Sequence, residues 1–185
     1  TQSRSSAASD VYKRQLLSTP SGLLLSLTDT ENLLADEAGQ SFASSACNTL
    51  NIEITEVRKQ GDMLARGLHS EAESGKLLDA VAMVKLRFLC DDEPAQLRAD
   101  RILLLRIPTN TATLDDDYQA YFSSAASDSA FTRWAFPGTP AYFAEWPVGQ
   151  GIQKGYELVV NRLGWTACAR PFINTAASTF CVQLD

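Results

Sequence analysis

Alternation of apolar and polar residues is the feature that most constrains the fold of this chain. Residues Leu50–Thr55 place leucine or isoleucine at every second position, with polar residues between them. Residues Val84–Phe88 repeat the pattern around Lys85 and Arg87. A strand with this period turns one face to a core and the other to water, which is typical of antiparallel sheets. Further strand-like runs are Ile102–Ile107, Tyr156–Val160 and Thr179–Leu184.

Turn residues separate these runs at short intervals, and helical periodicity is weak throughout. Only Glu31–Glu37 and Asp116–Ser124 show a helix-like spacing. Several short strands separated by turns favour a β-sandwich over a barrel or an α/β fold. The sequence therefore predicts an all-β, antiparallel sandwich of the immunoglobulin-like type.

The chain divides by composition into segments of different character. The alternating strands predict a sandwich domain over residues 16–108. Residues 109–154 predict an aromatic-rich crossover, because nine of the sixteen aromatic residues lie between Tyr118 and Trp146. Residues 155–185 predict the start of a second β unit, which is expected to be truncated because two strands alone are marginal in water.

The charge balance excludes some classes of partner. The formal net charge is −6, with 22 acidic and 16 basic residues. Nucleic-acid binding relies on clustered Lys and Arg, so no nucleic-acid partner is expected. No apolar run approaches the ~20 residues that a membrane-spanning helix needs.

The sequence of the first fifteen residues is unlike that of the rest of the chain. Ser5–Gln15 resembles the translation of the read-one adapter of transposase-based sequencing libraries, and Thr1–Arg4 fits the adjoining index. We therefore expect residues 1–15 to be adapter-derived and disordered, with Val11 and Tyr12 outside any core. The native start, with any signal peptide, is then missing, and the chain is a fragment of metagenomic type.

The four cysteines leave two alternatives open. They are Cys47, Cys90, Cys168 and Cys181, and none forms the C-x-x-C pair of a zinc ribbon or a thioredoxin-like motif. Cys168 and Cys181 flank a plausible hairpin, so they could form a disulfide in an oxidising compartment. The simpler alternative is that the cysteines are buried free thiols that pack as small apolar residues.

The aromatic segment contains the best candidates for ligand binding. Trp134, Tyr142 and Trp146 could stack on sugar rings or anchor a partner protein if they are exposed. The alternative is that these rings close one end of the sandwich as a small satellite core, and this alternative is favoured.

Two acidic clusters are candidates for a calcium site. Asp115, Asp116 and Asp117 are consecutive, as are Asp91, Asp92 and Glu93. Carboxylate oxygens are suitable calcium ligands, but neither cluster has the glycine spacing of a dedicated calcium loop. The alternative is that both clusters are solvated turns.

The sequence contains no clear catalytic or cofactor motif. His69 is the single histidine, in a polar turn-like context, so a catalytic role for it is not expected. Gly149–Gly151 lacks the context of a phosphate-binding loop, and no cofactor is predicted.

Three segments occur in an order that resembles a known group of proteins. They are Leu50–Leu64, Ser74–Leu78 leading to Ile102–Pro108, and Tyr156–Arg170. Together they resemble uncharacterised secreted or envelope proteins of the Bacteroidetes type, which share a sandwich similar to the ZU5 domain. This chain has Ala167 and Ala169 where the group has Asn and Asp. The resemblance implies a non-catalytic sandwich in an extracytoplasmic location, that is, the periplasm, the outer-membrane surface or the medium.

These observations lead to one functional hypothesis and one alternative. The hypothesis is a non-enzymatic structural or interaction module of a bacterial cell-envelope protein, including lipoproteins, or of a secreted protein. The alternative is a carbohydrate-binding or calcium-dependent adhesion module that uses the aromatic segment. The sequence does not identify the protein or glycan partner.

Overall fold

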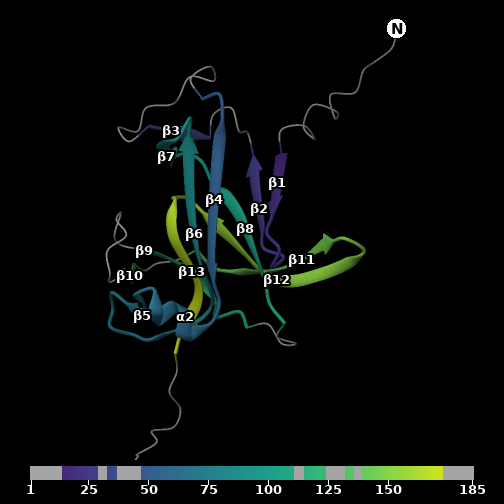
Figure 1. The fold of residues 1–185 in the computed structure, drawn as a ribbon. Coiled ribbons are helices and arrows are strands. Elements are labelled where there is room, and N and C mark those ends of the chain that lie inside the picture. Colours follow the sequence, from purple (N-terminus) through teal and green to yellow (C-terminus); the bar gives the residue numbers. More distant parts are fainter. Residues whose placement is uncertain are drawn as a thin grey trace, which may run out of the picture.

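The computed structural model describes residues 14–28, 33–36, 47–110, 115–123, 132–135 and 139–172. Their strands form two sheets, which are shown in Figure 1. The predicted all-β, antiparallel sandwich is confirmed. Of the segment assigned to an adapter, only Arg14 and Gln15 lie within the described residues, and they begin the first strand.

The first sheet has five strands, in the order β1-β2-β8-β12-β11. Every neighbouring pair in it is antiparallel. The strands are β1 (Arg14–Ser18), β2 (Leu24–Thr28), β8 (Leu103–Pro108), β12 (Gly151–Val160) and β11 (Tyr142–Val148).

The second sheet has eight strands, seven of them in the order β3-β7-β6-β13-β9-β10-β5, with β4 paired to β6. Its pairs are antiparallel except for β10 and β5, which are parallel. The strands are β3 (Leu34–Ala35), β4 (Leu50–Val57), β5 (Leu68–Ala72), β6 (Leu78–Cys90), β7 (Glu93–Leu97), β9 (Gln119–Ser123), β10 (Thr132–Ala135) and β13 (Gly164–Pro171).

The predicted boundary near residue 155 does not separate two units. Strand β12 pairs with β8 from Gly155↔Pro108 to Val160↔Leu103. Strand β13 pairs with β6 from Gly164↔Leu86 to Pro171↔Leu78. The last two strands therefore complete the sheets that residues 14–108 begin, and the crossover supplies β9, β10 and β11 to the same sheets.

The main core lies between the two sheets. The first sheet contributes leucines, isoleucine and valine from β2, β8 and β12, and the second contributes the alternate residues of β6. Val84, Leu86 and Phe88 are each at most 1 % exposed. This is the one-sided burial that the alternating pattern predicts.

A second core lies on the opposite face of β6, and it contains Trp134, for which a satellite core was the favoured alternative. Met83 of β6 packs there with Trp134 of β10, Tyr121 of β9 and Met63 of the short helix α2 (Gln60–Ala65). Full burial of side chains of this size stabilises the fold by about 1.5–3 kcal/mol each. The second sheet is thus covered on both faces along part of its length.

The helix-like spacing at Asp116–Ser124 predicted the wrong element. Residues Gln119–Ser123 form β9, and its neighbours Tyr121 and Phe122 are buried in the second and the main core, respectively. Consecutive aromatic residues can both be buried because successive side chains of a strand point to opposite faces. In the other helix-like segment, Glu31–Glu37, residues 33–36 are described and Leu34–Ala35 form strand β3. The segment Thr179–Leu184 lies wholly outside the described residues.

A close backbone approach at Gly155 leads to a prediction about stability. A Cβ atom at this position would lie 2.0 Å from the Ile107 carbonyl oxygen, which is backbone and cannot rotate away. We expect Gly155→Ala to lower the free energy of unfolding by about 3 kcal/mol, measured by urea denaturation.

Gly61 provides the matched control for Gly155. A Cβ added there meets nothing within 4 Å, and the residue lies in α2. Because alanine favours helix, Gly61→Ala should leave stability unchanged or raise it by up to about 1 kcal/mol. Equal effects of the two substitutions would contradict the close approach at Gly155.

Candidate functional site

The hairpin formed by β11 and the first half of β12 projects from the body of the sandwich (Figure 1). The two strands pair from Tyr142↔Glu157 to Val148↔Gly151. Gly149 has φ 59°, which suits the first central position of a type II′ turn. We call residues 142–154 the arm.

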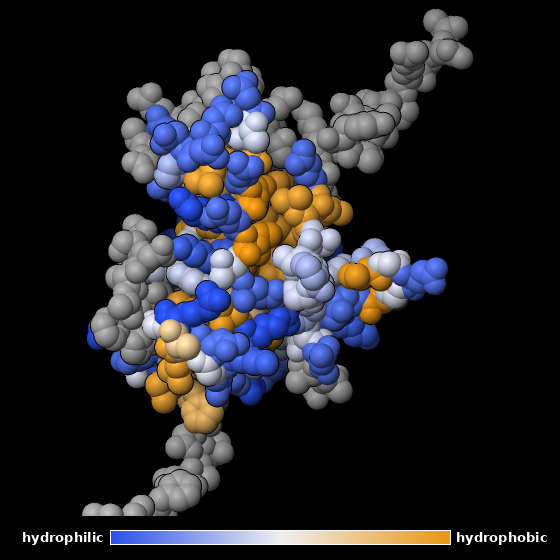
Figure 2. Space-filling model, in the orientation of Figure 1, coloured by the Kyte–Doolittle hydropathy of each residue, from blue (hydrophilic) through white to orange (hydrophobic). Residues whose placement is uncertain are grey.

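The arm exposes apolar side chains on both of its faces. Its exposed apolar residues are Tyr142, Phe143, Val148 and Ile152, with exposed fractions of 54 %, 49 %, 46 % and 71 %. Tyr142 and Phe143 are neighbours in one strand and therefore point to opposite faces. Figure 2 shows apolar side chains beside hydrophilic ones on this projection. An exposed apolar group of this kind is typical of an interaction site.

The charges of the arm cancel. Glu145 and Lys154 are its two charged residues. They face each other across the hairpin, with the Lys154 ammonium 2.8 Å from a Glu145 carboxylate oxygen. Both are exposed, so the pair adds little stability. It leaves the arm neutral on a chain of net charge −6.

The structure does not bring the three predicted aromatic residues together on a surface. Trp134 is 0 % exposed in the second core, and Trp146 is 1 % exposed. Buried rings cannot stack on a sugar, so these two fit the favoured alternative of rings packed inside the fold. Tyr142 is exposed, on the arm.

Of the acidic residues Asp115–Asp117, Asp115 pairs with an arginine, and the three carboxylates do not form a metal site. Arg170 of β13 donates a hydrogen bond through Nη1 to Asp115 and through Nε to Asp79 Oδ2, the latter at 3.2 Å. The Asp117 N–H donates to Asp115 Oδ1 at 3.0 Å. Asp116 and Asp117 are exposed. Among the described residues, no group of three or more potential ligands is arranged to hold a metal ion.

Two tyrosines complete the cluster around Arg170. The Tyr118 hydroxyl donates to Asp79 Oδ2 at 3.3 Å, and the Arg170 guanidinium lies 5.1 Å from the centre of the Tyr118 ring. The Tyr156 hydroxyl accepts a hydrogen bond from the Asp115 N–H at 3.0 Å. This network ties residues 115–118 to β6, β12 and β13, so its role is structural.

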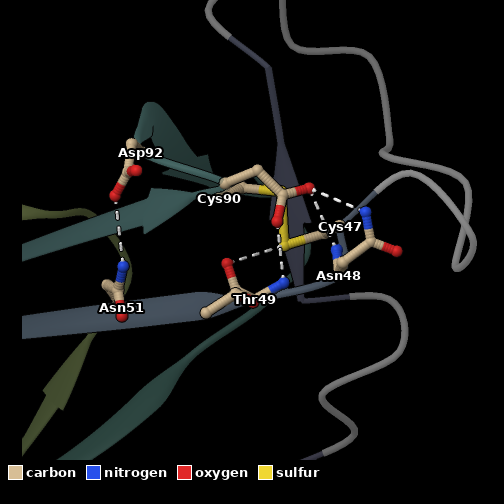
Figure 3. The surroundings of a disulfide bond; sticks show 7 residues. Cys47, Asn48, Thr49, Asn51, Cys90 and Asp92 are labelled. Carbon is tan, nitrogen blue, oxygen red and sulfur yellow. Dashed lines mark hydrogen bonds between the residues drawn. A yellow bond between two sulfur atoms is a disulfide. The ribbon is translucent and has the colours of Figure 1, made fainter.

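The other acidic cluster forms the turn between β6 and β7, beside a disulfide (Figure 3). Asp91 and Asp92 have φ of 48° and 69°, the left-handed conformation that a two-residue type I′ hairpin requires. The N–H groups of Asn48 and Thr49 donate to the Asp91 carboxylate at 3.1 and 2.8 Å. These hydrogen bonds, from Asn48 and then Thr49, lower the pKa of Asp91. The cluster is therefore a turn that is fixed by hydrogen bonds.

The disulfide joins Cys47 to Cys90, with 5.4 Å between their Cα atoms. Of the two alternatives for the cysteines, the buried free thiol describes Cys168, whose pKa is raised by burial, and it is wrong for Cys47 and Cys90. Cys181 lies outside the described residues. His69 is in β5, away from the arm, and its side chain is not among those described.

Comparisons with known proteins found no match to a family model, a curated protein or a solved structure. No helix among the described residues is long and apolar enough to cross a membrane.

The disulfide leads to a prediction about stability. It closes a loop with a sequence separation of 43 residues. Restriction of the unfolded chain by such a loop gives a stabilisation of about 4 kcal/mol. We expect dithiothreitol, or the double substitution of Cys47 and Cys90 by alanine, to lower the free energy of unfolding by this amount. Reductant should not change the free energy of unfolding of the double variant. A wild-type protein whose free energy of unfolding is also unchanged by reductant would contradict the disulfide.

The Arg170 cluster leads to a prediction at alkaline pH. Burial and the neighbouring Asp79 carboxylate raise the pKa of Tyr118 to about 12, whereas an unfolded tyrosine titrates near pH 10. The stability that this phenol contributes is present below pH ~10 and is lost as pH rises toward 12. Denaturation of wild type and Tyr118→Phe at pH 9 to 12 should show a smaller loss in the variant. Parallel loss in both proteins would contradict the pKa shift.

Proposed function

We propose that this domain is a non-enzymatic structural module of a bacterial cell-envelope or secreted protein. The Cys47–Cys90 disulfide is the observation that carries the proposal. Structural disulfides persist in oxidising compartments and are rare in the cytosol. The resemblance of residues 50–172 to secreted and envelope sandwiches supports the same location.

The arm is the surface through which we propose that the module contacts another chain. Its apolar residues are exposed on both faces, so a partner can pack against side chains rather than only add a strand. Pro147 removes a backbone donor from the edge strand β11, which lowers its capacity for strand addition. Contact through side chains is therefore favoured over sheet extension.

The proposed occupant of this surface is a second copy of the chain. Two copies that each carry a net charge of −6 repel one another in most orientations. The neutral arm is a place where apolar surfaces can meet with little repulsion, because Glu145 is already paired with Lys154. The contact area of so small an element is modest, so a weak and concentration-dependent dimer is expected.

The alternative proposal, glycan or calcium-dependent adhesion, has less support. Of the three aromatic residues that it needs, Tyr142 alone is exposed, and Asp115 is paired with Arg170. A single exposed tyrosine provides one stacking face. The self-associating module is therefore the better-supported proposal.

Sedimentation velocity tests the role of the arm. Wild-type protein should show an increasing dimer fraction as its concentration rises through the micromolar range. Because Ile152 is 71 % exposed on the arm, Ile152→Asp should leave the fold intact. A carboxylate buried in an apolar contact should raise the dissociation constant at least about tenfold.

The control is the same substitution at an exposed isoleucine outside the arm. Ile102 is 48 % exposed and precedes β8. Ile102→Asp should leave the dissociation constant unchanged. A strictly monomeric wild type, or equal effects of the two substitutions, would overturn the proposed contact.

A further inference from the structure

A hollow at one end of the molecule is independent of the arm. It has a volume of about 480 Å³, within the range of small-molecule sites. The end of β4, the loop after it, helix α2 and the turn between β1 and β2 line it. Its polar lining residues are Ser21, Glu56, Arg58, Lys59, Asp62 and Arg66.

One part of this lining is a fixed hydrogen-bond network. Arg58 donates through Nε to Glu56 Oε1 at 2.5 Å and through Nη1 to the Pro108 carbonyl at 2.6 Å. The Ser21 hydroxyl donates to Glu56 Oε2. Since this uses the one Ser21 proton, the Thr19 hydroxyl must be the donor in its 2.7 Å contact with Ser21. Both oxygens of Glu56 are thus occupied, and its charge is offset by Arg58.

The remaining cations of the hollow are free to bind a ligand. Lys59 and Arg66 are exposed, and within the described part of the chain neither side chain has an ion-pair or hydrogen-bond partner. Asp62 is the one acid of the lining that is left beside them. The lining therefore carries three positive and two negative charges, on a chain whose net charge is −6. The local positive charge of this hollow can attract an anion, although the protein as a whole is negatively charged.

We infer that this hollow binds a small ligand through a carboxylate or phosphate group. Arg66 has all its guanidinium donors available, and this planar fork matches the two oxygens of either group. Lys59 adds a point charge. Arg58, which is held by Glu56 and the Pro108 carbonyl, adds positive charge from a fixed position. The volume accommodates a group the size of an acidic monosaccharide or a sugar phosphate.

Titration of the intact ¹⁵N-labelled protein tests this site. The probes are inorganic phosphate, glucuronate and uncharged glucose, each added at constant ionic strength. At least one of the two anions should give saturable shifts of the amides of residues 57–66, and glucose should give none. Saturation by phosphate or by glucuronate would show which oxyanion the site prefers.

Three substitutions locate the binding on the proposed residues. Arg66→Ala should weaken anion binding at least about tenfold, because it removes a charge-assisted bidentate contact. Asp62→Asn should strengthen binding by about two- to fivefold, because it removes a like charge. Lys76 is exposed and lies outside the hollow, so Lys76→Ala makes a comparable change of charge and should have no effect.

The side chains of Lys59, Asp62, Arg66 and Lys76 are all exposed, so the variants should fold. A change in anion binding can then be assigned to the substituted side chain. Saturable binding that is lost in Arg66→Ala and retained in Lys76→Ala would support the site. Non-saturating shifts with both anions would overturn it. So would equal weakening by Arg66→Ala and Lys76→Ala, which would indicate general charge screening.

Discussion

Strand β6 is the element on which the rest of the structure depends. It spans Leu78–Cys90 and pairs with β4, β7 and β13. Because β4 and β13 both pair with residues 83–86, they lie on its two edges. Val84 faces the main core and Met83 the second core, and both are 0 % exposed. Loss of β6 would therefore disrupt both cores and remove the strand with which β4, β7 and β13 all pair.

Rigidity in the body and exposure in the arm have a common physical origin. From Gly155 onward, β12 pairs with β8 and buries Tyr156, Leu158 and Val160 in the main core. Before Gly155, the ladder continues with β11 alone, and side chains on both faces meet solvent. The absence of a Cβ at Gly155 lets the Ile107 carbonyl approach where the two regions join. One strand thus anchors the fold and presents the surface that we propose for self-association.

The sequence predicted what depends on local pattern and missed what depends on pairing between distant segments. Leu50–Ile54 and Val84–Phe88 are buried on one side, so apolar and polar residues alternate along them. This alternation predicted the fold class. Ala82–Val84 is instead buried on both faces, so this strand gave no alternation that indicated the second core, although a satellite core was the favoured alternative for Trp134. The Cys47–Cys90 disulfide follows from the pairing of β4 with β6, and the Arg170–Asp79 contact joins residues 91 positions apart. In the arm, the sequence indicated Tyr142 as a candidate residue, but Gly149–Gly151 was not recognised as the turn of a hairpin.

Native-state hydrogen exchange tests most directly whether β6 is the stable centre and the arm its loosely held extension. Amides differ in exchange according to the free energy of the opening that exposes them. We predict that the amides of Val84–Phe88 exchange only through global unfolding. The amides of residues 143–154 should exchange at least about a hundredfold faster in dilute protein. Equal protection of the two segments, or faster exchange in β6 than in the arm, would contradict this account.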